Sequence, residues 1–237
     1  EGRVEQFPLK LGETFQNLGG KILLGDEVKQ IMIEKKKAFG ARLRNGQEME
    51  GKVIISNIDA YLTFMDLIGE DFLPGGFLSK LKGMKPSLSY FILYLGIEGE
   101  LDGLSVSNNE VFPNDLLREE YQALHENRIP DKAPFYLLTP SNKASTFVPN
   151  LEKRILVKVE TTPKTIEHWT RNRWGAAYGW AQIPSQSGIY RLSRTTPILD
   201  LYLTGHWTSP GGGIAAVVAS GELTAKTILS KFEEGEF

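Results

Sequence analysis

Apolar and polar positions over the first sixty or so residues predict one helix followed by several strands. Apolar residues recur at helical spacing over 9–18, and two glycines then end the predicted helix. Alternation over 27–34 predicts a strand. The pair Asn45-Gly46 is the strongest two-residue hairpin signal, and it joins apolar runs at 39–43 and 47–53.

Three short apolar runs lack alternation, which is typical of strands that are covered on both faces. They lie at 21–24, 53–55 and 201–204, and we expect them to form parallel strands. Three strands are too few for a sheet that is buried on both faces. The second run ends in residues 56–59, whose short polar side chains suit a turn or a helix cap.

The middle of the chain has a different texture, in which strands and exposed helices are mixed. Its pattern predicts strands at 87–97, 135–138 and 155–161 and helices at 114–127 and 165–173. A loop rich in glycine and aromatic residues follows at 175–180.

The end of the sequence is the most informative. A strand over 199–204 runs into the glycine triplet 211–213, and a helix of about four turns is expected from Ile214 onward. Its first turns are apolar almost all round, so we expect them to be buried on more than one side. Helical spacing defines the expected inner face as Ile214, Val217, Val218, Gly221, Ala225 and Ile228.

The three glycines leave the amino end of this helix free of side chains. A ligand can then contact backbone N–H groups where the helix dipole favours negative charge. A phosphate or the N1–C2=O edge of a reduced flavin fits such a site, and a tight strand-to-helix turn explains the glycines equally well. Residues 211–216 also match a relaxed dinucleotide motif, GxGxxA, but no second strand follows, so we reject that role.

Composition narrows the function classes. The chain has 27 Lys and Arg against 29 Asp and Glu, and this net charge of −2 argues against a nucleic-acid-binding surface. The lack of cysteine excludes disulfides, thiol catalysis and thiolate metal sites. His125, His168 and His206 are too scattered for a helical metal-binding pair, and we expect no metal site. No signal peptide is visible, and no apolar run approaches the roughly 20 residues that span a bilayer.

Three segments carry a family resemblance. The segment LYLTGHWTSPGGGIAAVVASG, residues 201–221, resembles the C-terminal flavin-binding segment of the phytoene desaturase family. That family includes carotenoid desaturases, carotenoid isomerases and retinol saturases, within the amine-oxidase-like FAD superfamily. The loop GAAYGWAQIPSQ, residues 175–186, resembles the family's substrate-side loop, and parts of 18–59 resemble its helix, adenine-side strand and hairpin.

The resemblance implies roles for individual residues. Val28 matches the residue whose backbone contacts the adenine of FAD. Gly205 and His206 match the pair that ends the last sheet strand, beside the ribityl–pyrophosphate part of FAD. The helix mouth under the isoalloxazine ring corresponds to Gly212, Gly213, Ile214 and Ala215.

Three residues leave alternatives open, and the catalytic residues are unknown. The superfamily commonly has an acidic residue where this chain has His206, so this imidazole either bonds to FAD hydroxyls or faces solvent at a strand end. Tyr178 and Trp180 are either walls of an apolar substrate pocket near the flavin or aromatic residues of the core. We identify no catalytic acid or base, because hydride transfer at flavin N5 does not require one.

The family begins with a Gly-rich βαβ unit, which this chain does not contain. We therefore expect a mixed α/β and α+β protein, the distal half of a Rossmann-like FAD-binding domain with an inserted mixed-sheet substrate domain. Residues 1–60 form a partial FAD-binding domain, 61–196 the substrate-binding domain, and 197–237 the strand and helix that return to the first domain. The missing N-terminal part of the same protein is the expected partner, and the fragment alone is expected to be inactive.

The resemblance implies an FAD-dependent oxidoreductase that desaturates, saturates or isomerises a long apolar polyene, such as a carotenoid or retinoid lipid. Two alternatives remain. One is an amine-oxidising flavoenzyme, and the other is a cofactor-free, prenyl- or lipid-binding chaperone resembling Rab GDP-dissociation inhibitors. We expect a cytoplasmic location with peripheral membrane contact, to which the apolar segment 72–81 contributes unless it packs in the core.

Overall fold

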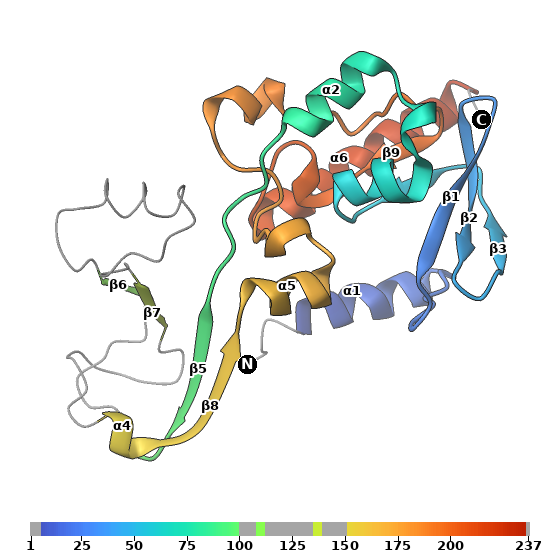
Figure 1. The fold of residues 1–237 in the computed structure, drawn as a ribbon. Coiled ribbons are helices and arrows are strands. Elements are labelled where there is room, and N and C mark those ends of the chain that lie inside the picture. Colours follow the sequence, from blue (N-terminus) through green and yellow to red (C-terminus); the bar gives the residue numbers. More distant parts are fainter. Residues whose placement is uncertain (1–5, 100–107, 112–134, 139–150, 236–237) are drawn as a thin grey trace. The chain divides into compact units, whose positions relative to one another are not determined.

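The computed structural model describes residues 6–99, 108–111, 135–138 and 151–235 (Figure 1). The chain divides into two compact units, one made of Glu1–Phe91 with Thr161–Phe237 and the other of Ile92–Glu160. Each unit is described by itself below. The second unit lies wholly inside the predicted substrate domain 61–196, whose own limits stay a prediction.

The first unit contains both helices and strands, so the expected mixed class is confirmed. Its helices are α1 (Gln6–Asn17), α2 (Gly75–Gly83), α5 (Pro163–Thr170) and α6 (Ile214–Glu233). Its strands are β1 (Val28–Glu34), β2 (Lys37–Leu43), β3 (Glu48–Glu50), β4 (Ile54–Ser56) and β9 (Leu201–Leu203). Shorter helical segments are the π-helix Leu62–Ile68 and the 3₁₀ turns Glu70–Phe72, Arg173–Gly175, Pro184–Gln186, Gly188–Tyr190 and Gly205–Trp207.

Strands β1, β2 and β3 form an antiparallel sheet in that order. The predicted hairpin at Asn45-Gly46 is confirmed, and it joins β2 to β3. Gly46 has a φ of 86°, a conformation that glycine adopts without steric cost. The amide N–H of Gln47 donates to the side-chain oxygen of Asn45 at 2.9 Å, which closes the turn.

Strands β4 and β9 form a separate, parallel pair in which Ile54 lies opposite Leu201 and Ser56 opposite Leu203. Two of the three predicted parallel strands are therefore confirmed. The third, at 21–24, is wrong, because these residues form no strand and are exposed. An apolar run becomes a strand only where another strand offers its backbone groups, and the described residues place none beside this run.

The second unit consists of paired strands. β5 (Ile92–Ile97) pairs with β8 (Ile155–Thr161), and β6 (Asn108–Val111) pairs antiparallel with β7 (Phe135–Leu138). Helix α4 (Leu151–Arg154) directly precedes β8. The predicted strands of this region are confirmed, although β5 starts later than expected, and the predicted helix at 114–127 lies outside the described residues.

The core of the first unit lies between η1 (the π-helix Leu62–Ile68), α2 and the loops around β9. Phe64 is fully buried and meets Phe77 edge to face, with ring centroids 4.7 Å apart. Within the segment 72–81, Leu73 and Leu81 are buried, and only Phe72 among its large apolar residues is exposed. Most of the segment's large apolar side chains therefore pack in or against the core, the second of its two predicted roles.

Two tryptophans tie the loop at 172–180 to the turn after β9. Their rings meet edge to face with centroids 4.8 Å apart, and both are fully buried. The indole N–H of Trp180 donates to the carbonyl of Trp207 at 2.9 Å, and that of Trp207 donates to the Asn172 side chain at 3.2 Å. Both buried indole N–H groups are therefore satisfied, as buried polar groups must be.

Helix α6 buries a different face from the predicted one. Its buried residues are Ser220, Thr224 and Ile228, which follow each other at four-residue spacing. Of the predicted inner face only Ile228 is buried, Val217 is half-buried, and the remaining four residues are exposed. The hydroxyls decide the orientation, since Thr224 donates to the Leu203 carbonyl at 3.1 Å and Ser220 accepts the Gly205 N–H at 3.1 Å.

Asp59 holds together two segments that are distant in sequence. It is buried, and its carboxylate accepts the amide N–H of Tyr61 at 2.7 Å and that of Arg173 at 2.8 Å. The guanidinium of Arg173 lies over the Tyr61 ring, 4.0 Å from its centroid. Burial raises the pKa of Asp59, and the two hydrogen bonds and the charge of Arg173 oppose that rise.

We expect Ser220→Ala to lower the free energy of unfolding by about 1–3 kcal/mol, because it leaves the buried N–H of Gly205 without its acceptor. Ser230 lies in the same helix but is exposed, so Ser230→Ala should change stability by less than about 0.5 kcal/mol. Urea unfolding of both variants measures the difference. Equal effects would contradict the assigned role of Ser220.

The raised pKa of Asp59 predicts a pH-dependent difference between wild type and Asp59→Asn. The folded state holds the Asp59 proton more tightly than the unfolded state, so this contribution to stability is complete below the unfolded pKa of about 3.9. It is lost as the pH rises through the folded pKa. Asparagine does not titrate, so urea unfolding should show wild type losing stability relative to the variant over this range; parallel pH profiles would refute the assignment.

Candidate functional site: the amino end of α6

The candidate site begins where the parallel strands β4 and β9 end. Asn57 follows β4, and Thr204 and Gly205 follow β9. The amide N–H of Thr204 donates to the Ser56 carbonyl at 3.0 Å, which keeps the two chains adjacent beyond the strands. In α/β sheets ligands bind outside the carboxyl ends of the strands, so this edge is the expected place for a site.

Gly205 is required by its surroundings. Its φ is 82°, and a Cβ at this position would collide with the side-chain oxygen of Asn57. The chain can therefore turn away from β9 only at a glycine. The turn leads through the 3₁₀ segment Gly205–Trp207 to the glycine triplet that precedes α6.

The three glycines of the triplet have different surroundings. A Cβ at Gly211 would lie 3.0 Å from the side-chain nitrogen of Gln182, and one at Gly212 would lie 2.7 Å from Cβ of Tyr178. Gly213, by contrast, has a φ of 97° and nothing within 4 Å of its Cβ position. Protein packing therefore accounts for the first two glycines, whereas the third borders open space.

Gly213 is also the N-cap of α6, and no side chain caps this helix. The side chain of Ile214 is 66% exposed, and Ala215 is exposed. The first amide N–H groups of a helix have no partner within the helix, and a 20-residue helix directs the positive end of its dipole at them. The mouth, which we define as residues 211–215, is therefore open to a hydrogen-bond acceptor or an anion.

His206 is half-buried beside this turn. Burial, and then the positive charge of Arg191, lower the pKa of His206, so the imidazole is neutral at pH 7. Its ring lies edge to face with that of Trp207, with centroids 5.5 Å apart. Because His206 is only half-buried, both predicted alternatives, a hydrogen bond to FAD hydroxyls and a solvent-facing position at the strand end, stay predictions.

Arg191 holds the same turn through hydrogen bonds to its carbonyls. The sequence gives no indication of this role. Arg191 is only 3% exposed. Its guanidinium donates to the carbonyls of His206 at 2.7 Å and Thr208 at 2.9 Å, and to that of Trp180 at 3.4 Å. An arginine among many charged residues carries no signal by itself, and only the three-dimensional structure reveals this one as buried.

Tyr178 and Trp180 were predicted as pocket walls or core aromatics. The structure encloses Trp180 completely, so it has the position of a core residue. Tyr178 is 44% exposed, backs onto Gly212, and meets Tyr90 edge to face at a centroid distance of 6.1 Å. Of the two, Tyr178 is therefore placed beside the mouth with exposed surface, and its contact with a substrate stays a prediction.

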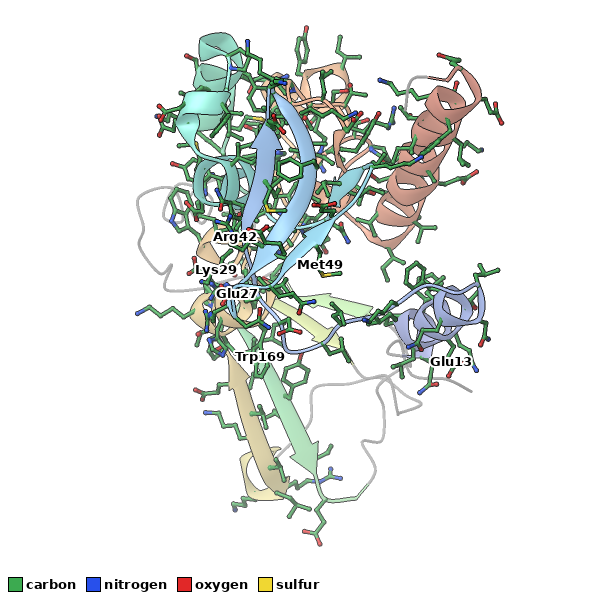
Figure 2. The ribbon with its side chains drawn as sticks, turned by 90° about the vertical axis from the view of Figure 1, so that its right-hand side faces the viewer. Glu13, Glu27, Lys29, Arg42, Met49 and Trp169 are labelled. Carbon is green, nitrogen blue, oxygen red and sulfur yellow. The ribbon has the colours of Figure 1, made fainter. Side chains whose placement is uncertain are left out.

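Val28 is the one predicted cofactor residue outside the turn and the mouth. It begins β1 and pairs with Leu43 in the other sheet, so the structure does not place it beside residues 205–215. Next to it, Glu27 pairs with Lys29 at 2.8 Å (Figure 2). Glu27 also pairs with Arg171 at 3.2 Å. The hydrogen bond from Lys29 contributes most to lowering the pKa of Glu27, despite its surface position.

The described part of the chain contains neither a candidate metal site nor a candidate membrane-spanning helix. Residues 6–99, 108–111, 135–138 and 151–235 contain no group of three or more His, Asp or Glu side chains that could hold a metal ion. Among the helices formed by these residues, none is both long and apolar enough to cross a membrane.

No family model matches the chain. It is 24% identical to a lycopene-forming phytoene desaturase of Paracoccus sp., in an alignment that covers 97% of this chain and 54% of the relative. It is 25% identical to a 4,4'-diapolycopene oxygenase of Methylomonas sp., over 91% of this chain and 52% of the relative.

A third relative comes from zebrafish (Danio rerio). It is named an inactive all-trans-retinol 13,14-reductase and is 26% identical over 71% of this chain and 30% of its own length. Among solved structures, an oxidoreductase from Methanosarcina mazei matches with a TM-score of 0.53 and 17% identity, over 91% of this chain and 52% of that one. At this level of identity the structural match shows a shared fold.

The bacterial relatives and the solved structure agree on the extent of the match. The chain spans about half the length of each. The relationship predicted from the three sequence motifs is thereby confirmed: this chain is a homologue of the phytoene desaturases and of related carotenoid oxygenases and retinol reductase-like proteins.

Proposed function

We propose that this chain is the distal half of an FAD-dependent oxidoreductase whose substrate is a long apolar polyene. In this proposal residues 1–60 and 197–237 belong to a Rossmann-like FAD-binding domain, and 61–196 to the substrate domain. The one observation that carries the proposal is the uncapped, open mouth of α6 at the carboxyl edge of the parallel pair β4–β9.

The residues of the mouth fit a flavin. A flavin's N1–C2=O edge needs hydrogen-bond donors and, in the reduced form, a positive environment, and the first amide groups of α6 supply both. Gly213 to Ala215 would hold this edge, Gly205 and His206 would lie toward the ribityl chain, and Val28 would contact the adenine. When bound, FAD would supply the hydride-accepting N5 atom.

The exposed apolar surface supports a larger protein. Strands β4 and β9 form a parallel sheet of only two strands in the described part of the chain, whereas parallel sheets are normally covered on both faces. Helix α6 also leaves an apolar set of side chains exposed, namely Ile214, Val218, Leu223, Leu229 and Phe232. A further part of the FAD-binding domain, supplied by the same protein, would cover these surfaces, which is consistent with the half-length match to the relatives.

The names of the relatives support polyenes over amines as substrates. They name phytoene, diapolycopene, diaponeurosporene and retinol, all of which are chains of conjugated or isolated double bonds. The same names, all of enzymes or enzyme-like proteins, favour an oxidoreductase over a cofactor-free lipid chaperone. We also propose a cytoplasmic location with peripheral membrane contact. The only support for this part of the proposal is the apolar substrate class.

We expect Ala215→Glu to weaken FAD binding at least tenfold, because it places a carboxylate at the mouth where the negative flavin edge would lie. The substitution does not harm the helix, since acidic residues are favourable in the first turn. The protein is expressed from its complete gene, and bound flavin is measured by absorbance and by titration of the apoprotein.

Ala225→Glu is the matched control, because Ala225 is also an exposed alanine of α6 but lies well beyond its first turn. This variant should bind FAD as wild type does. Wild-type protein without bound flavin after reconstitution would overturn the FAD proposal, and equal affinity in both variants would remove the mouth from the binding site. Conversion of a supplied carotenoid or retinoid, followed by chromatography, tests the substrate class.

A further inference from the structure

Arg191 is a buried cation with no negative partner among the residues that the structure describes. Burial lowers the pKa of its guanidinium, and no carboxylate within the described part of the chain offsets that effect. Two of its nitrogens donate to backbone carbonyls of the turn after β9 and of the tryptophan loop, whereas its Nη1 is buried with no hydrogen-bond partner in the described part of the chain. A buried charge that lacks a partner is costly, and this cost points to a role of Arg191 beyond bracing the turn.

The guanidinium lies against the mouth of α6. A Cβ built on Gly211 would lie 3.5 Å from Cζ of Arg191, and Gly211 is two residues before the N-cap Gly213. The charge of Arg191 and the positive end of the helix dipole therefore act on the same place. In a water-poor environment, the effect of such a charge reaches well beyond van der Waals contact.

We propose that Arg191 is an electrostatic positioning residue that makes the mouth of α6 a site for negative charge, and that it thereby stabilises the reduced form of a flavin bound there relative to the oxidised form. This inference rests on the proposed function. Uptake of a hydride, which brings two electrons and one proton, adds one negative charge to a flavin. A fixed positive charge nearby then favours the reduced over the oxidised form.

The direct test is the two-electron reduction potential of the flavin in the protein expressed from its complete gene. Arg191→Gln removes the charge and should lower the affinity for reduced relative to oxidised flavin at least tenfold, which is about 30 mV for a two-electron couple. Arg191→Lys keeps the charge but not the fork of hydrogen bonds, so its potential should stay close to that of wild type. Equal shifts in the two variants would show that Arg191 acts only by bracing the turn, and would overturn the inference.

A second variant leaves Arg191 in place and therefore does not depend on the folding of the first two. Gln182 is exposed, and its side-chain nitrogen and the Arg191 guanidinium both lie against the same point beside Gly211. Gln182→Glu provides the missing carboxylate with almost no change in shape, and it should lower the potential in the same direction as Arg191→Gln. Ser230→Glu, near the other end of α6, adds the same charge on an exposed position and should leave the potential unchanged.

The outcomes separate this inference from the proposed function. If the wild-type protein binds no flavin, the proposed function fails and the inference falls with it. If the wild-type protein binds flavin but Gln182→Glu and any folded Arg191→Gln protein keep the wild-type potential, the inference alone fails. A lower potential in Gln182→Glu, with Ser230→Glu unchanged, supports the inference.

Discussion

The structure around β9 depends on one constraint: the chain must turn into a buried loop while every backbone polar group keeps a partner. Gly205 makes the turn, and the hydroxyl of Ser220 accepts its N–H. The Thr224 hydroxyl donates to the last carbonyl of β9, and Arg191 donates to the carbonyls of residues 206 and 208. Side chains from α6 and from the preceding loop thus supply the hydrogen-bond partners that neighbouring strands of a longer sheet would supply. These bonds also hold the mouth of α6 in place.

The same constraint explains which parts of the fold the sequence predicted. Local signals were sufficient for the Asn45-Gly46 hairpin and for strands β4 and β9, because turn chemistry and apolar runs act over a few residues. The prediction of the inner face of α6 was wrong because it relied on hydrophobicity, which ranks Ile214 and Val218 above Ser220. The backbone at the end of β9 instead needs hydroxyl groups as hydrogen-bond partners. Such a need arises from residues that are far apart in sequence.

In the candidate site, too, the sequence predicts features with a local motif and misses those that depend on distant contacts. The glycines of the mouth are visible in the sequence as a motif, and the structure adds that only Gly213 borders open space. Asp59 was predicted only as a turn or cap residue, and Arg191 was not singled out at all. Asp59 depends on a segment more than a hundred residues away, which supplies the Arg173 N–H. Arg191 depends on carbonyls of a turn later in the chain. Neither kind of contact leaves a local sequence pattern.

His206, which stands where the resembled superfamily commonly has an acidic residue, bears on the uncompensated charge of Arg191. The FAD superfamily that the sequence resembles commonly has an acidic residue at the position that His206 matches, and a carboxylate beside Arg191 would compensate the guanidinium charge. His206 cannot do so, because an imidazole is either neutral or cationic, and burial and the charge of Arg191 lower its pKa and so favour the neutral form. The imidazole thus preserves a hydrogen-bonding group at the end of β9 while leaving the charge of Arg191 uncompensated. A site built in this way has a more positive mouth than one with an acidic residue at this position, and it would hold a reduced, negatively charged ring more tightly.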